Sequence, residues 1–331
     1  MSPPEALLIL TDDDLLAAHW QGLAAAPVRA RGLDGLDAYS KPDQPASLGP
    51  LLRAETLGLE GGRLAESVTI ARALLARHQA YFGTDALETI QAAQTLANLI
   101  GRSGDLAGAT PLWEQTLTQL RAAFGEDDAR TISTMDFLGA NLAMQGDNEA
   151  ALPLHLKALE LHRRVQGNEH PQTLQSMNSA AITLSRMDRL PEAIQMAADA
   201  LELRKRTLGP DHPQTLRSLL NVGAFYANAD DLAKAAALTR ECYERRRRTL
   251  GPDNPDVYTA ALNLADFEII LGHPQEGLRL AEETLTERLR LLGPDHPDVR
   301  IARVLLGRAL AAASVWKRAI PLLEEQLAED A

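Results

Sequence analysis

The sequence predicts an all-α protein, a solenoid of about seven antiparallel helix pairs preceded by a short helical arm. Two observations carry this prediction. A motif recurs along the chain at a constant spacing, and each repeat unit holds signals for two helices, with no room for a strand. Only 4% of the residues are aromatic, so the core must be built mostly from aliphatic side chains and alanine, as is typical of stacked helices.

The repeat is marked by a glycine that recurs at a constant interval, at positions 83, 125, 167, 209, 251 and 293. The sequence Gly-Pro-Asp-His-Pro stands at both 209–213 and 293–297, with close variants at 167–171 and 251–255. Self-similarity at a fixed period of this length is the signature of a repeat architecture. Extended backwards, the frame reaches Lys41, so we predict a solenoid over residues 41–331. Its repeats start near residues 41, 83, 125, 167, 209, 251 and 293.

Residues 1–40 precede the repeats. Ser2 and Thr11 each stand three residues before an acidic residue, the spacing of an N-terminal capping box, and the stretch 15–26 is the better helix candidate. We predict an N-terminal helical arm, with a connector from residue 29 to 41, that caps the first repeat. The alternative is an arm that binds a partner or a second copy of the chain.

Each repeat begins with a polar residue followed by proline, as in His212-Pro213 and Asn254-Pro255. A polar side chain caps a helix, and proline suits its first turn. The first helix, here called helix A, should run for about 16 residues. A turn such as Gly104-Asp or Asp188-Arg then precedes helix B, of about the same length. The histidines at 170, 212 and 296 are expected to cap helices and not to bind a metal, because equivalent residues of stacked repeats lie about 10 Å apart.

Small residues recur at one position of helix A and at one position of helix B. Such columns let helix backbones approach closely where they cross. The helix A column is Ala97, Gly139, Ala181, Gly223, Ala265 and Gly307; the helix B column is Ala109, Ala151, Ala193, Ala235, Gly277 and Ala319.

Composition excludes several classes of function. The formal charge of −12 argues against nucleic-acid binding, which needs clustered Lys and Arg. The run Arg245–Arg248 is dense in cations, but it lies at the end of a predicted helix B, with Asp211, Asp253 and Asp295 in the loops of this region. We interpret it as an ion-paired or solvated edge, with a docking strip for an acidic partner as the alternative.

The start of the sequence does not resemble an address label and no stretch is long and apolar enough for a membrane span, so we expect neither; the single cysteine, Cys242, cannot form an internal disulfide. We therefore expect a soluble, cytoplasmic protein. Cys242 falls in a column of small helix B residues and is expected to be buried. No catalytic, phosphate-binding, metal or dinucleotide motif occurs, so we predict no enzyme activity, no cofactor and no metal.

The repeats resemble the tetratricopeptide repeats (TPR), specifically the 42-residue type of kinesin light chains. The resemblance rests on the Leu-Gly-Pro-Asp-His-Pro openings at 208–213 and 292–297, the Leu-Asn-Leu-Ala segment at 262–265, and the helix B stretches Glu192-Ala193 and 158–160. It covers roughly 290 residues of the chain and is strongest from Gly167 onward. It implies a right-handed superhelix whose concave side is lined by helix A.

The candidate binding residues lie on helix A. Counted from the small-residue column, the positions six and three residues before it and one and five after it fall on one helix face. Asn221 and Asn263, two residues before the column, lie on the margin of that face. The predicted peptide-binding residues are Gln91, Gln94, Asn98, Arg102, Gln175, Asn178, Arg186, Arg217, Asn221, Asn228, Asn263 and Asp266.

Amide and guanidinium groups that lie in a row along successive helices can form hydrogen bonds with the backbone of an extended peptide. In kinesin light chains, the asparagines of a Leu-Asn-Asn-Leu-Ala segment clasp cargo in this way. Here Asn178 matches the first asparagine, while Asn221 and Asn263 match the second, and no repeat carries both.

We therefore predict a non-enzymatic module that binds a peptide or an extended segment of a partner protein in the concave groove. The first alternative is a regulatory or scaffolding subunit that holds a partner enzyme, or self-assembles, through its convex face and ends. The second is an enzyme with a site between the arm and the first repeats.

Overall fold

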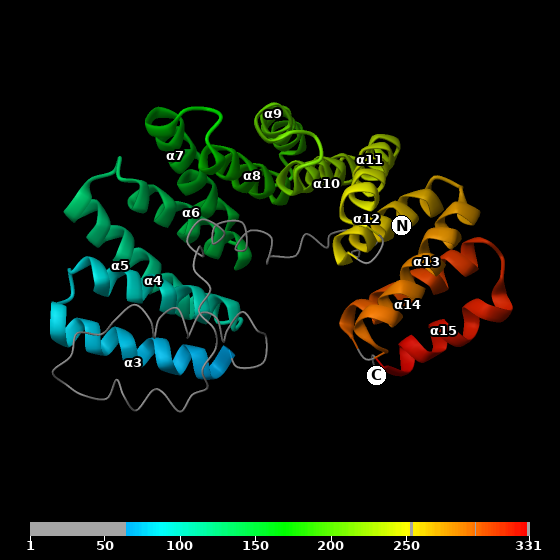
Figure 1. The fold of residues 1–331 in the computed structure, drawn as a ribbon, viewed down its shortest axis with the longest axis horizontal. Coiled ribbons are helices and arrows are strands. Elements are labelled where there is room, and N and C mark those ends of the chain that lie inside the picture. Colours follow the sequence, from blue (N-terminus) through cyan, green and yellow to red (C-terminus); the bar gives the residue numbers. More distant parts are fainter. Residues whose placement is uncertain (1–63, 252–253, 295, 330–331) are drawn as a thin grey trace. The chain divides into compact units, whose positions relative to one another are not determined.

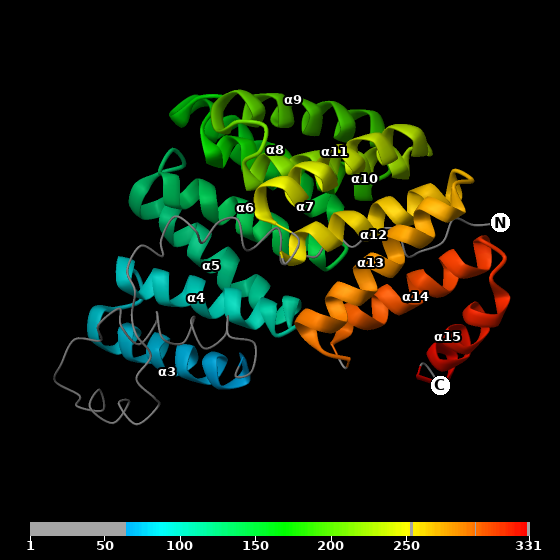
Figure 2. The ribbon, with the colours of Figure 1, turned by 45° about the vertical axis from the view of Figure 1, so that its right-hand side comes forward.

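The computed structural model describes residues 64–251, 254–294 and 296–329, and this part of the chain contains thirteen α-helices and no strand. The chain divides between Met187 and Asp188 into two compact units, which we call the N-terminal unit and the C-terminal unit. Within each unit, successive helices are joined by short turns and run side by side in alternating directions (Figures 1 and 2). The all-α prediction and the paired helices are confirmed.

The helices alternate in length along the chain, with 16 residues in each helix A and 19 in each complete helix B. In the N-terminal unit they are α3 (Leu64–Phe82), α4 (Leu87–Arg102), α5 (Leu106–Phe124), α6 (Ala129–Met144), α7 (Asn148–Gln166) and α8 (Pro171–Arg186). In the C-terminal unit they are α9 (Leu190–Leu208), α10 (Pro213–Asn228), α11 (Leu232–Leu250), α12 (Pro255–Ile270), α13 (Pro274–Leu292), α14 (Pro297–Ala312) and α15 (Trp316–Glu329).

Helix B is longer than helix A, whereas the sequence suggested that the two are equal in length. It continues to the residue directly before the repeat glycine, so the glycine alone ends it. The proposed arm at residues 1–40 and the first helix A of the array, within residues 41–63, lie outside the described residues.

The helix starts follow the predicted capping chemistry. His170, His212 and His296 each accept a hydrogen bond at Nδ1 from the backbone N–H two residues on, with N to Nδ1 distances of 3.2–3.3 Å. Asn254 does the same through Oδ1 at 2.9 Å. The periodic histidines are therefore helix caps, and the described residues hold no group of His, Cys, Asp and Glu arranged to bind a metal.

The repeat glycine is required by its backbone conformation. Gly209 has φ 93° and ψ 159°, a region open to glycine because it lacks a Cβ, and Gly167 has nearly the same angles. At the turn from helix A to helix B the backbone is also left-handed, but Asp188 and Asp230 adopt it there with φ 59°. This second turn accepts aspartate because its φ lies in the left-handed helical region, which short polar side chains tolerate.

Both small-residue columns are buried where helices cross. Ala97, Ala181 and Ala265 on helix A are fully buried, as are Ala109 and Ala193 on helix B. A Cβ built on Gly277 would lie 2.9 Å from the carbonyl oxygen of Ala265. The columns thus mark the closest approach of helices A and B, as predicted.

Cys242 is buried in α11, where its thiol donates a hydrogen bond to the carbonyl of Leu216 at 3.3 Å. Burial raises the pKa of the thiol to about 11. Because the thiolate is the reactive form, this cysteine acts as a small core residue.

Candidate functional site

All twelve predicted binding residues lie on the helices of the A type. In the N-terminal unit, α4 carries Gln91, Gln94, Asn98 and Arg102, and α8 carries Gln175, Asn178 and Arg186. In the C-terminal unit, α10 carries Arg217, Asn221 and Asn228, and α12 carries Asn263 and Asp266. The intervening α6 contributes no residue to the predicted set.

These side chains differ in how much surface they offer. Arg186 is exposed, and seven more are half-buried: Gln91, Gln94, Arg102, Gln175, Arg217, Asn228 and Asn263. Asn98, Asn178, Asn221 and Asp266 are buried, with 5–8% of their surface exposed. The amide Nδ2 of Asn98 is buried and has no hydrogen-bond partner among the described residues.

Three of the predicted residues tie neighbouring repeats together. Gln94 Nε2 donates to Thr134 Oγ1 on α6 at 2.7 Å, and Arg186 Nη1 donates to the carbonyl of Ala143 at 2.8 Å. Asp266 pairs with Arg308 at 2.7 Å; these two residues hold the same helix position in successive repeats. Burial raises the pKa of Asp266, while the charge of Arg308 opposes the rise.

One column of helix A is polar and half-buried through successive repeats. It lies six residues before the small-residue column and comprises Gln91, Ser133 and Gln175 in the N-terminal unit, then Arg217 and Thr259 in the C-terminal unit. The next residue of this column is Ile301, which is 38% exposed. Every polar member can donate a hydrogen bond from its side chain.

The structure also reveals a buried polar cluster that sequence reasoning missed. Asp136 on α6, 8% exposed, accepts a hydrogen bond from Ser176 Oγ at 2.5 Å and faces two imidazoles of α7, His155 at 3.2 Å and His162 at 3.5 Å. Burial would raise the pKa of Asp136, but the hydrogen bonds from His155 and Ser176 and the contact with His162 outweigh it, so the pKa lies below the ordinary value. The carboxylate is therefore held ionised in the core.

A signal for this cluster exists in the sequence. Asp136 stands one repeat after Gln94 and one repeat before Asn178, so it shares their column. His155 fits because Gly139 lies beneath it: a Cβ on Gly139 would come within 2.8 Å of the imidazole. Glycine in the small-residue column thus makes room for a large polar neighbour.

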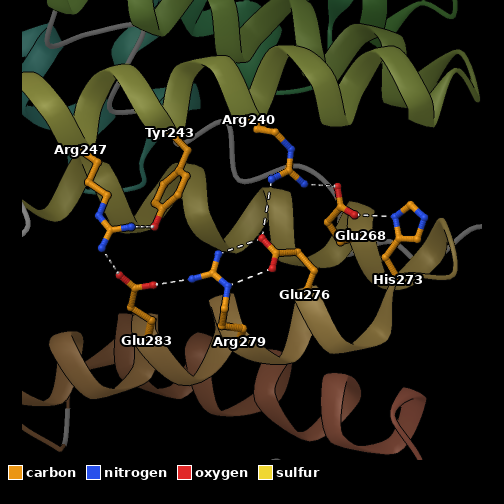
Figure 3. Close-up of polar contacts among 8 residues, drawn as sticks. All are labelled: Arg240, Tyr243, Arg247, Glu268, His273, Glu276, Arg279 and Glu283. Carbon is orange, nitrogen blue, oxygen red and sulfur yellow. Dashed lines mark hydrogen bonds and ion pairs between the residues drawn. The ribbon is translucent and has the colours of Figure 1, made fainter.

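A second polar cluster joins α11, α12 and α13 in the C-terminal unit (Figure 3). Arg240 pairs with Glu268 at 2.8 Å and with Glu276 at 3.6 Å, and Glu268, 7% exposed, also contacts His273 at 2.7 Å. Arg279 continues the network to Glu276 at 2.8 Å. Arginine donors and glutamate acceptors alternate in this network, so it links the three helices. Its charges are paired with one another and offer little for a charged ligand to bind.

The basic run at the end of α11 is ion-paired, as predicted. Arg245 and Arg248 both bind Asp211, at 2.9 and 3.0 Å. The pKa of Asp211 is lowered, chiefly by its hydrogen bond from Arg245. Asp253 and Asp295, which were expected to act similarly, lie outside the described residues.

One surface cavity of about 440 Å³ lies in the N-terminal unit. It is lined by α3, α4 and α5, with Leu75, Leu96 and Leu112 among its apolar residues and Arg72 and Asp105 among its polar ones. Asp105 is already engaged as the N-cap of α5, where it accepts from the N–H of Gly108 at 2.8 Å. No helix in the described part of the chain is long and apolar enough to span a membrane.

The paired helices, their small-residue crossings and their constant repeat length define the chain as an α-solenoid repeat protein. The family model of the tetratricopeptide repeat matches residues 132–206, 181–248 and 256–328, and the chain belongs to this family. The resemblance to the tetratricopeptide repeats that the sequence showed is thereby confirmed.

Several solved structures share the fold of this chain. A candidate kinesin light chain from Podosopora anserina with nearly identical TPR-like repeats is 19% identical, covering 61% of this chain and 96% of its own, with a TM-score of 0.56. BtubC (BKLC) from P. vanneervenii is 19% identical over 74% of this chain and 94% of its own, with a TM-score of 0.56. The apo form of RapI is 13% identical over 83% of this chain and 96% of its own, with a TM-score of 0.58. No curated protein matches the chain in sequence.

Proposed function

We propose that this protein is a non-enzymatic interaction module whose helix A face binds an extended segment of a partner protein. The observation that carries the proposal is the half-buried polar column within each unit, Gln91, Ser133 and Gln175 in the N-terminal unit and Arg217 and Thr259 in the C-terminal unit. Membership of the tetratricopeptide family supports a role in protein–protein interaction. We further propose that the protein acts in the cytoplasm.

A periodic column suits an extended ligand. A peptide backbone presents N–H and C=O groups at regular intervals, and side-chain donors and acceptors at successive repeats can pair with them. Backbone pairing of this kind gives affinity without a strict sequence requirement, and specificity then comes from neighbouring pockets.

The predicted binding residues fall into two groups, those that support the fold and those that can contact a ligand. Gln94 and Asp266 are held by Thr134 and Arg308, and Asn178 and Asn221 are buried. Gln94 and Asp266 thus link successive helices A, whereas Gln91, Gln175 and Asn263 are half-buried and have surface to offer a ligand. We therefore propose that the half-buried amide side chains are the ones that contact the partner peptide.

The proposal is tested with a peptide library displayed on phage. Peptides selected on the full-length protein are measured by fluorescence anisotropy on the variant carrying Gln91→Ala and Gln175→Ala. Loss of two hydrogen bonds, each contributing about 1 kcal/mol, should weaken binding by roughly tenfold or more. The control is Gln195→Ala, an exposed amide on α9 that bonds Asp199 at 2.8 Å.

If the double variant binds the selected peptides as tightly as the control does, the helix A face is not the binding surface. Circular dichroism of both variants should be unchanged, because none of the three substituted glutamines is part of the core.

A further inference from the structure

The last described helix of the array, α15, exposes two large apolar side chains (Figure 1). Trp316 and Ile320 are 55% and 48% exposed. The residues at the same positions of α5 are Leu106 and Thr110, and both contact the helix A that follows α5. There the amide of Asn141 on α6 donates to the carbonyl of Leu106 at 3.1 Å and to Thr110 Oγ1 at 2.9 Å. Trp316 and Ile320 therefore lie on the side of α15 where a following helix would pack, and none of the described helices follows α15.

Helix α14 differs from the other helices A of the described chain at two positions. Arg300 and Arg303 stand where each preceding helix A carries a buried apolar residue. These residues are Ile90, Ile132, Leu174, Leu216 and Tyr258 at the position of Arg300, and Ala93, Met135, Met177, Leu219 and Ala261 at the position of Arg303. Arg300 is exposed and Arg303 is half-buried, and none of the described residues forms an ion pair with either. We call Arg300, Arg303, Trp316 and Ile320 together the end face.

The composition of the end face is that of a binding surface. Terminal repeats need a polar outer side to keep a solenoid soluble, and the two arginines would suffice for that role. An exposed tryptophan and isoleucine do not serve it, and tryptophan and arginine are enriched at the centre of protein interfaces. On α15, Lys317 and Glu324 are exposed as well and offset each other in charge, so the arginines make the end face positive. The matching partner is acidic and carries large apolar side chains.

The N-terminal arm of this chain has that chemistry. Residues 1–40 contain six acidic residues and two arginines, a formal charge of 2 − 6 = −4. The apolar run 7–10 lies between Glu5 and the acidic run 12–14, and Leu15, Leu16 and Trp20 follow. Carboxylates and large apolar side chains thus alternate within one short segment, residues 5–20.

We propose that the end face binds the acidic N-terminal arm of this chain through residues 5–20. The carboxylates of residues 12–14 pair with Arg300 and Arg303, and the apolar residues of the arm cover Trp316 and Ile320. Two end faces do not suit each other, because their arginines would repel. The inference does not rest on the proposed peptide function, since it involves neither Gln91 nor Gln175.

The test is photo-crosslinking of the purified full-length protein at low ionic strength. Benzoylphenylalanine replaces Trp316, which keeps an aromatic ring at that position, and mass spectrometry maps the adducts. The control carries the same residue at Leu156 on α7, which is 40% exposed. We expect adducts within residues 1–40 from position 316 and none from position 156. A mixture of isotopically heavy and light protein tells whether the arm belongs to the same molecule or to a second copy.

Charge reversal tests the pairing itself. Arg300→Glu combined with Arg303→Glu should lower the adduct yield about tenfold, because two attractive contacts become repulsive. Adding Asp12→Lys and Asp13→Lys should restore the yield. The matched control is Arg163→Glu combined with Arg164→Glu on α7, two exposed arginines outside the end face, and it should leave the yield unchanged.

Should the double variant fail to fold, Arg300→Glu alone carries the comparison, because Arg300 is exposed. Adducts that map to helices of a second copy in place of the arm would overturn the proposal. The absence of adducts from position 316, or a yield that charge reversal leaves unchanged, would overturn it as well.

Discussion

Among the side chains of the N-terminal unit, we expect removal of the buried carboxylate of Asp136 to lower the stability most. Asp136→Ala removes the acceptor of His155 and Ser176 and the anion beside His162, and we expect a loss of about 3 kcal/mol in the free energy of unfolding. Urea unfolding at pH 7 measures it. Glu160→Gln, on the exposed side of α7, is the control and should change stability by less than about 0.5 kcal/mol.

The same carboxylate sets a pH dependence. The pKa of Asp136 in the folded protein lies below its ordinary value of 3.8, so its stabilisation is complete above that value and is lost as the pH falls through the folded pKa. We expect wild type and Asp136→Asn to converge in stability below about pH 3.8, when both are followed by urea unfolding. A gap that persists unchanged in acid would contradict this account.

Two glycines inside helices should respond oppositely to alanine. A Cβ on Gly277 would lie 2.9 Å from a backbone oxygen, whereas on Gly101 its nearest neighbour would be a side-chain atom at 3.5 Å. Gly277→Ala should therefore lose about 1–3 kcal/mol through overpacking, and Gly101→Ala should be neutral or gain up to about 1 kcal/mol from helix propensity. Thermal unfolding of both variants distinguishes a tight helix crossing from a permissive one.

The turns that separate the helices should also respond oppositely to substitution. Gly209 ends α9 at φ 93° and ψ 159°, so Gly209→Ala should cost about 1–3 kcal/mol although no atom lies near the new methyl group. Asp230, with φ 59°, precedes α11 in a conformation that glycine adopts freely, and Asp230→Gly should be neutral or stabilising by about 0.5 kcal/mol. Chemical denaturation measures both, and a neutral Gly209→Ala would show that the repeat glycine is not needed for its backbone.

Helix boundaries and packing were predictable from sequence because they depend on local signals that recur. The histidine and asparagine caps, the repeat glycine and the small-residue columns all appear where the spacing placed them. Helix B, at 19 residues, is longer than predicted because it fills the whole interval between the preceding turn and the repeat glycine.

The polar contacts were harder to predict because they join residues of successive repeats, far apart in the sequence and on facing helices. Gln94 with Thr134, Asp136 with Ser176, and Asp266 with Arg308 each connect successive repeats. Periodicity predicts the helix face on which a residue lies. It does not predict which residue of the neighbouring helix its side chain contacts. The row of binding residues on helix A stays a prediction, because periodicity places these residues on one face but does not show what they bind.

Repeat arrays hold each helix pair only through its neighbours, so stability should fall toward an end. In the C-terminal unit, α15 packs on α14, and Trp316 and Ile320 are 55% and 48% exposed. Amide hydrogen exchange should be fastest in α15 and slowest in α12, whose core residues Leu264 and Ala265 are fully buried. Equal protection of α12 and α15 would contradict this nearest-neighbour picture.

Site-specific photo-crosslinking tests most directly whether helix A binds the partner. A photoreactive amino acid replaces Gln175 on α8 in one sample and Glu160 on α7 in the other, and each protein is irradiated in extract of its native host. We predict that position 175 forms adducts with an extended segment of one partner, that mass spectrometry maps them to that segment, and that Gln91→Ala weakens them. Equal crosslinking from position 160, or adducts that Gln91→Ala leaves unchanged, would show that the partner binds elsewhere.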